Sequence, residues 1–195
     1  MKSGFTAAPF QRHLARLFSI NMQMSKAQLA TYLRNFVFGV EDSLVSTVGL
    51  ISGVAIAGAS RSAIFLTGMV LIFVEAFSMG VGSFLSEESS ESYINQGPAA
   101  SRLSLGAAVI MFGSYFLSGF IPLSPYLIAQ DTRHAFVWSI IASLLALFVL
   151  GMWGASLSKL PKARGGLRMM LIGGIAIALG VCVGALMNQA GFSVV

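Results

Sequence analysis

Three of the seven acidic residues in this 195-residue chain lie inside long apolar stretches, where a charge is costly. These residues are Glu41, Asp42 and Glu75. An ionisable side chain near the middle of a membrane costs at least about 2.5 to 3.5 kcal/mol, so it normally faces a bundle interior or a water-filled path. Because carboxylate oxygens bind divalent cations well, all three are candidates for a cation path. The alternative is that they pair with an arginine or lie near a hydrated interface.

Asp42 and Glu75 each belong to a stripe of small and polar residues at helical spacing. The first stripe is Gly39, Asp42, Ser46, Gly49 and Gly53, and the second is Gly68, Glu75, Met79, Gly82 and Ser86. A stripe of small residues alone more often marks close helix packing than a pore. We therefore assign packing roles to Gly39, Gly49, Gly53 and Gly82. The embedded carboxylates favour a narrow polar crevice as well, and we include Ser46 in its lining.

Met79 adds a thioether to this crevice. At 1.5 Å per residue, Asp42 lies roughly 10 Å and Met79 roughly 12 Å from the same end of two antiparallel helices, with Glu75 at roughly 18 Å. A lone methionine in a helix is ordinarily a packing residue. Beside a carboxylate, its softness disfavours Mg²⁺ and Ca²⁺ and favours metals such as Fe²⁺. Asp42 and Met79 are therefore our central metal site.

An acidic cluster, Glu87, Glu88 and Glu91, follows the second apolar stretch directly. Glu87 and Glu91 stand four residues apart, a spacing at which like charges destabilise a helix by a few tenths of a kcal/mol. A divalent cation would compensate for this repulsion. We predict that the cluster is a cytoplasmic funnel that captures metal, and a solvated acidic loop is the alternative.

The chain offers little for catalysis. Its single cysteine, Cys182, cannot form an internal disulfide, and its two histidines, His13 and His134, lie outside the apolar stretches. The sequence contains no HExxH or CxxC motif and no histidine inside a stretch to activate a serine. We therefore expect no enzymatic activity and no prosthetic group.

The elements that must position these residues are membrane helices. The chain is 56% hydrophobic and 10% charged, with a mean hydropathy of +0.82, whereas soluble domains carry roughly 25% charged residues. Apolar stretches of about 20 residues, enough to cross a bilayer, run approximately over residues 35–58, 63–85, 103–121, 136–157 and 167–187. They are continuous, unlike the alternating strands of a membrane barrel. We predict an all-α polytopic membrane protein with five transmembrane helices in one domain, residues 33–190.

Residues 1–32 form a separate N-terminal arm that lacks the long apolar run and cleavage site of a signal peptide. Its apolar residues at about 9–20 follow an amphipathic helical spacing: Phe10, Leu14, Leu17 and Phe18. A helix lying on the membrane surface and a disordered arm are both compatible with this segment.

The basic residues are distributed unequally between the two sides of the membrane. Only Arg61 and Arg133, of the 12 lysines and arginines, lie on one side, and the other ten lie on the side of the N-terminal arm. Because positive residues collect in the cytoplasm, the N-terminus is expected there and the C-terminus across the membrane. The net charge of +5 thus reflects topology and does not indicate a nucleic-acid partner.

Four segments resemble signatures of the vacuolar iron transporter family. The residues from Phe38 to Leu50, followed by Gly53, are similar to its first-helix signature, and Phe77 to Ser86 to its second. Gly119 to Tyr126 resembles the proline-bearing end of its third helix, and Ala146 to Gly151 resembles part of its fourth. The resemblance extends over about residues 33–188.

This resemblance implies an exporter that moves Fe²⁺ or Mn²⁺ out of the cytosol in exchange for protons and works as a homodimer. It implies that Asp42 and Met79 line the path, in a prokaryotic inner membrane or, in a eukaryote, a vacuole-type membrane. Ser43 replaces the glycine that commonly follows the aspartate, and Leu71 stands where members often carry a carboxylate, one turn from Glu75. The short connection at 86–102 lacks the metal-binding insert of plant and fungal members.

Two further hypotheses concern the carboxylates. Glu75, the deepest of them along its helix, is expected to exchange protons during transport, because a bound cation displaces protons from a carboxylate. The alternative function is a membrane scaffold, in which the buried carboxylates only tie helices together. Metal uptake into sealed vesicles distinguishes the two.

Overall fold

The computed structural model describes residues 8–98, 101–129 and 131–191, and it places side chains from residue 26 onward, except at residue 101. These residues form α-helices and no strand, in the order α1 (Ala8–Ile56), α2 (Arg61–Asn95), α3 (Ser101–Ile128), α4 (Thr132–Leu157) and α5 (Lys162–Gln189). Each helix contains a stretch that is long and apolar enough to cross a membrane. The predicted all-α fold with five spanning helices is therefore confirmed, whereas its orientation in the membrane stays a prediction.

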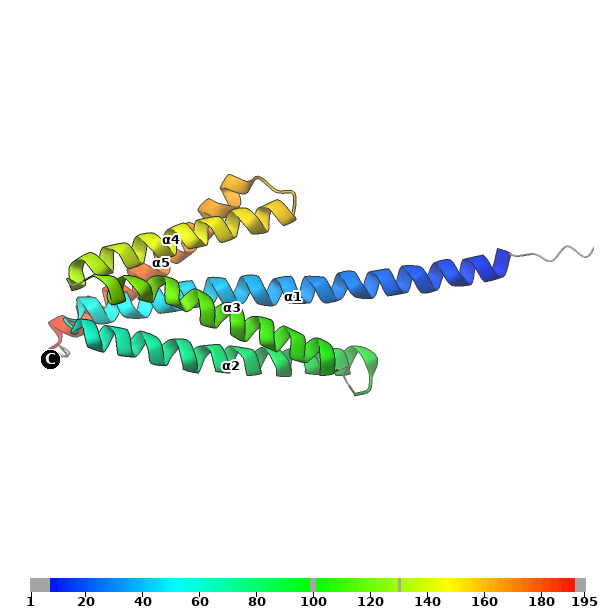
Figure 1. Ribbon diagram of the computed structural model, residues 1–195, viewed down its shortest axis with the longest axis horizontal. Coiled ribbons are helices and arrows are strands. Elements are labelled where there is room, and N and C mark those ends of the chain that lie inside the picture. The colour runs from blue at the N-terminus through cyan, green and yellow to red at the C-terminus, as the bar shows by residue number, and fades with distance from the viewer. Residues whose placement is uncertain (1–7, 99–100, 130, 192–195) are drawn as a thin grey trace, which may run out of the picture.

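α1 is the central helix of the bundle and contacts all four others. α2 and α3 pack against each other on one side of it, and α4 and α5 on another (Figure 1). The α1–α2 and α3–α4 connections lie at one end of the bundle with the end of α5, and the α2–α3 and α4–α5 connections lie at the other (Figure 1). Successive helices therefore run in opposite directions. The chain enters the first span and leaves the fifth at opposite ends of the bundle.

The first part of α1 extends well beyond the other helices (Figure 1). α1 is one helix of 49 residues, and its membrane-spanning part is Lys26–Ile56. Residues 8–32 are its helical start, so the helix expected at 9–20 is continuous with the first span and is not a separate element. The side chains before residue 26 lie outside the described part, and the boundary of the arm at residue 32 stays a prediction.

α2 is longer than the sequence predicted, because it runs to Asn95 and not to about residue 85. Its 35 residues measure roughly 52 Å, more than the roughly 30 Å of a hydrocarbon core. The last turns of α2 therefore project from the core or tilt within it. They carry the acidic cluster, so the alternative of an acidic loop is wrong.

α3 continues through Pro122 and Pro125, whereas the sequence predicted its end just before them. A proline inside a helix removes a backbone donor and frees the carbonyl four residues earlier. The Ser124 hydroxyl donates to the Ile121 carbonyl oxygen at 3.0 Å, which satisfies the acceptor that Pro125 leaves. Ser139 of α4 donates to the Pro122 carbonyl oxygen at 2.7 Å. These hydroxyls support the helix and join it to α4.

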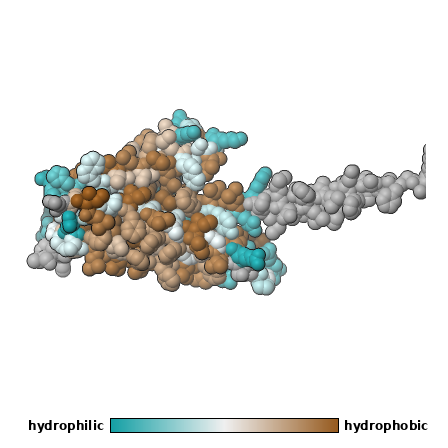
Figure 2. Space-filling model, in the orientation of Figure 1, coloured by the Kyte–Doolittle hydropathy of each residue, from teal (hydrophilic) through white to brown (hydrophobic). Residues whose placement is uncertain are grey.

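The surface is apolar, and small polar residues are inside. Phe77 and Leu117 are 67% and 70% exposed, whereas Ser43 and Ser139 are fully buried. Figure 2 shows a broad apolar band over one face of the bundle, with hydrophilic residues gathered towards its two ends. Cys182 of α5 is exposed as well. This arrangement suits a lipid surrounding, in which interfaces are rich in small residues.

Glycines allow α1 and α5 to approach closely. The Cβ atoms that alanines would add at Gly180 and Gly184 would overlap the carbonyl oxygens of Gly49 and Gly53. A Cβ added at Gly53 would lie 2.7 Å from the Gly180 carbonyl oxygen. The GxxxG pair of α1 therefore packs against a second GxxxG pair on α5, as such pairs do where two backbones meet.

The other two glycines assigned to packing behave differently from each other. A Cβ at Gly39 would overlap the Ser114 hydroxyl oxygen, so Gly39 lies at the α1–α3 contact. A Cβ at Gly82 would meet no atom within 4 Å. No close approach among the described residues requires a glycine at position 82, so a packing role for Gly82 within the single chain is wrong.

Candidate functional site

Contacts at two levels fix the register between the antiparallel helices α1 and α2. Near one end of the bundle, the Asn35 side chain donates to Glu87 at 3.5 Å and accepts from the Ser83 hydroxyl at 2.6 Å. Near the other end, an Ile51 methyl lies 3.3 Å from the Cβ position of Gly68. Both sets of contacts describe the same alignment of the two helices.

This register brings Asp42 and Met79 to one level of the bundle. Asp42 follows Asn35 by two turns on α1, and Met79 precedes Glu87 by two turns on α2. Each is therefore displaced by roughly 10 to 12 Å along its helix. Both side chains are half-buried. The arrangement is consistent with the common depth that the sequence predicts.

A second carboxylate, Glu75 of α2, lies within electrostatic range of Asp42. Both carboxylates also act on the phenol of Tyr115, a fully buried residue of α3. The Tyr115 hydroxyl shares a hydrogen bond of 2.7 Å with the Ser46 hydroxyl. Three helices thus assemble what we name the Asp42 cluster: Asp42, Ser46, Glu75 and Tyr115.

Ser43 of α1 joins the Asp42 cluster to α3. Its hydroxyl is fully buried and donates to the Tyr115 carbonyl oxygen at 2.6 Å. Tyr115 is therefore held at both its backbone and its phenol. The residue that stands where the resembled family commonly has glycine thus ties α1 to α3.

Glu41 lies on another face of α1 from Asp42, although the charge of Asp42 still acts on it. It lines a cavity of about 330 Å³ between α1, α4 and α5. Arg168 lines the same cavity, and its positive charge acts on Glu41. Neighbouring residues of an α-helix point about 100° apart, which explains why Glu41 and Asp42 diverge. The assignment of Glu41 to the path therefore stays a prediction, and so does the alternative of an arginine partner.

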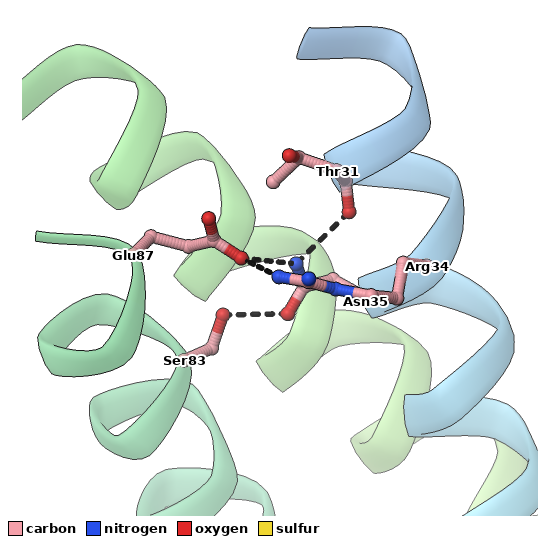
Figure 3. Close-up of polar contacts among 5 residues, drawn as sticks. All are labelled: Thr31, Arg34, Asn35, Ser83 and Glu87. Atoms are coloured by element: carbon pink, nitrogen blue, oxygen red, sulfur yellow. Dashed lines mark hydrogen bonds and ion pairs between the residues drawn. The ribbon is translucent and has the colours of Figure 1, made fainter. Parts of the chain in front are cut away.

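The acidic cluster on α2 contains residues in different surroundings. Glu87 is 7% exposed, and it accepts from the Arg34 guanidinium and the Asn35 amide (Figure 3). Glu88 and Glu91 are half-buried, and one Glu91 carboxylate oxygen is buried without a hydrogen-bond partner among the described residues. Glu87 is therefore buried and paired, and it is not a solvated carboxylate of an open funnel. Glu88 and Glu91 stay candidates for metal capture.

The Asp42 cluster has the chemistry of a transient cation site. Within the described residues, no three His, Cys, Asp or Glu side chains converge as a resident metal centre would require. What the helices bring together is two carboxylates with two hydroxyls, at the level of one thioether. Hydroxyl and carboxylate oxygens suit divalent cations, and the thioether adds softness.

Sequence reasoning missed three of the residues that organise this region. Tyr115 is one of four tyrosines in the chain, and nothing in its local pattern indicates a contact with α1. Arg34 and Asn35 stand at the start of the first apolar stretch, and nothing in their local pattern indicates a partner on another helix. A buried asparagine normally needs hydrogen-bond partners, so the Asn35 position carried a usable signal.

The fold and the site define a class: an integral membrane protein with five spanning helices and carboxylates of two helices within electrostatic range of each other inside the bundle. Residues 33–103 and 94–185 match the VIT family. The chain belongs to this family, which confirms the resemblance to vacuolar iron transporters.

Curated relatives agree with this assignment. Vacuolar iron transporter homolog 4 of Arabidopsis thaliana is 25% identical over 183 residues, which cover 83% of this chain and 90% of the relative. Vacuolar iron transporter 1 of the same plant is 24% identical over 209 residues, covering 77% and 84%. Protein CCC1 of Saccharomyces cerevisiae is 34% identical over 85 residues, covering 40% of this chain and 26% of the relative.

Proposed function

We propose that this chain transports a divalent metal, Fe²⁺ and/or Mn²⁺, out of the cytosol in exchange for protons. The observation that supports this most is that Asp42 and Glu75, on two helices of a membrane-spanning bundle, lie within electrostatic range of each other, with Met79 at the level of Asp42. The names of the relatives, vacuolar iron transporters, support iron as the substrate. The metal is cargo, and no prosthetic group takes part.

The ligand set suits a dication that has lost part of its water shell. Two carboxylates from α1 and α2 offset its charge, and the hydroxyls of Ser46 and Tyr115 offer further oxygen atoms. Carboxylate and hydroxyl ligands alone would also accept Mg²⁺ or Ca²⁺. Met79 supplies a soft sulfur atom, which favours Fe²⁺ over these harder ions.

Proton exchange follows from the same pair of carboxylates. Two like charges held close together repel each other, and either a proton or a metal ion relieves the repulsion. A metal ion that binds the pair therefore displaces protons from it. We assign the exchanged proton to Glu75. This residue lies further than Met79 from the acidic cluster at the end of α2, and it is deeper in the bundle than Asp42.

The assembly is a homodimer in this proposal, and an open groove supports it. The groove measures about 730 Å³ and lies between α1 and α5, lined almost entirely by apolar residues. Ser46, Gly49 and Gly53 line it, so it is continuous with the stripe that carries Asp42. A second copy is the occupant that we infer for this surface.

The test is metal transport by the purified chain in sealed vesicles. With a pH gradient imposed, the wild-type chain is expected to move Fe²⁺ or Mn²⁺ and to move protons in the opposite direction. Glu75→Gln should retain metal binding but lose the dependence of transport on the pH gradient. Pure scaffolding predicts no metal movement at all, and that result would refute the proposal. Competition among Fe²⁺, Mn²⁺, Co²⁺ and Zn²⁺ ranks the substrates.

A further inference from the structure

A polar network joins α1 to α2 (Figure 3). It lies about two helical turns from the level of Asp42. We propose that its Arg34–Glu87 ion pair is a gate on the metal path, which a divalent cation opens by displacing the Arg34 guanidinium from Glu87. This inference rests on the proposed transport function. It adds a cation-exchange step ahead of the central site.

The two partners of the ion pair are unequally accessible. The Arg34 side chain is 67% exposed, whereas the Glu87 side chain is 10% exposed. A buried carboxylate without a cation beside it is strongly unfavourable. Glu87 therefore requires a positive partner at all times, and Arg34 is the partner that can leave. A dication can satisfy the same requirement.

Asn35 and Ser83 hold the carboxylate side of the gate in place. Asn35 is 4% exposed, and its amide nitrogen donates to the Thr31 carbonyl oxygen at 2.9 Å and to Glu87 at 3.5 Å. Its amide oxygen accepts from the Ser83 hydroxyl at 2.6 Å. Three buried side chains are thus interlinked, and the guanidinium reaches them from the exposed side. The fixed element of the gate is Glu87, and the moving element is Arg34.

The position of the pair fits a step before the central site. Glu87 lies roughly 12 Å along α2 from the level of Asp42 and Met79, and Arg34 lies at a similar distance from that level along α1. Both are on the side from which the metal is proposed to enter. Both residues lie towards the end of the bundle that carries Glu88 and Glu91. A cation that moves between α1 and α2 from this end meets Glu87 before it meets Asp42.

The test compares half-saturation concentrations in vesicle transport, with Mn²⁺ added on the side that faces Arg34. Arg34→Gln removes the competing cation and is expected to lower the half-saturation concentration by at least about fivefold, the lower end of ordinary coupling between two ligands. Glu87→Gln removes the carboxylate and should raise it by a similar factor. The double variant should behave like Glu87→Gln. Arg61→Gln, at the opposite end of the bundle, is the matched control and should change nothing.

Opposite shifts in the two single variants support the gate, because a purely structural tie predicts that both variants lose transport alike. Shifts in the same direction would overturn it. Should Arg34→Gln not fold, Arg34→Lys tests the same point, since lysine keeps the charge but lacks the planar fork of the guanidinium; it should lower the half-saturation concentration by less, and an unchanged or higher value would overturn the gate. If the wild-type chain moves no metal, the proposed function fails and the gate fails with it.

Discussion

Three carboxylates of the bundle differ in their charged neighbours. The charges of both Asp42 and Arg168 act on Glu41, and Glu87 is paired with Arg34. The neighbour that acts on Asp42 is another carboxylate, Glu75. Because Asp42 has no basic partner among the described residues, a transported cation is expected to gain more there than at Glu87, which already has one.

Asp42→Asn is expected to reduce metal transport at least about tenfold, equivalent to 1.4 kcal/mol or more of lost binding. The neutral amide cannot offset the charge of a dehydrated dication. The measurement is the initial rate of metal uptake into vesicles, at equal amounts of folded protein.

Asp131→Asn is the matched control for this variant. Asp131 precedes α4 and caps it, and the hydrogen bond from the Arg133 backbone N–H, with help from His134, holds the pKa of its carboxyl below the ordinary value. It is therefore charged at neutral pH, and asparagine preserves the cap. Wild-type transport by Asp42→Asn, or an equal loss in Asp131→Asn, would remove Asp42 from the path.

Met79→Leu should weaken discrimination between metals more than it weakens transport. Leucine has a similar volume, so packing is kept while the sulfur atom is lost. The preference for Fe²⁺ over Mg²⁺ should fall by several-fold, because the remaining ligands are oxygen atoms. Met111→Leu is the control: Met111 is 4% exposed and packs against Gly39. An unchanged preference in Met79→Leu would assign Met79 to packing.

At the scale of helices, the sequence predicts most of what depends on one helix alone. The five spans follow from hydropathy, and the stripe that carries Asp42 follows from helical period. Contacts between helices are harder to predict from the sequence, because the pattern within one helix does not indicate which faces of two helices pack together. The pairing of Glu87 with Arg34 and the role of Tyr115 are of this kind. The continuation of α3 past its prolines depends on the neighbouring hydroxyls of Ser124 and Ser139.

Glycine substitutions test the contact between α1 and α5. Gly180→Ala places a methyl group against the Gly49 carbonyl oxygen, and overpacking of this kind costs about 1 to 3 kcal/mol. Gly174→Ala, on the same helix, meets no atom within 4 Å and is the control. The thermal midpoint in detergent should fall for Gly180→Ala and stay near wild type for Gly174→Ala. Equal midpoints would show that the close approach does not limit stability.

At the scale of the whole molecule, the bundle has two ends of different composition. Arg61 and Arg133 lie at the end where α2 and α4 begin, whereas Lys159, Lys162 and Arg164 lie at the end where α4 finishes and α5 begins. The positive-inside rule assigns the second end to the cytoplasm.

Cysteine labelling in a Cys182→Ser background tests this orientation. A cysteine at Lys162 in intact cells should resist a thiol reagent that cannot cross the membrane, and one at Arg133 should react. Both should react after the membrane is opened, which serves as the control. Labelling of the Lys162 site in intact cells would reverse the assignment and the direction of transport inferred from it.

The exposure of Cys182 gives the chain a natural reporter of its own assembly. It is the one thiol in the sequence and lies open on α5, whose face forms one wall of the groove between α1 and α5. A nitroxide attached there marks each copy once, so the unmodified sequence yields a single spin–spin distance if two copies associate and none if they do not. Spectroscopy in native-like lipid can therefore show whether two copies of the chain associate, without any substitution in the sequence.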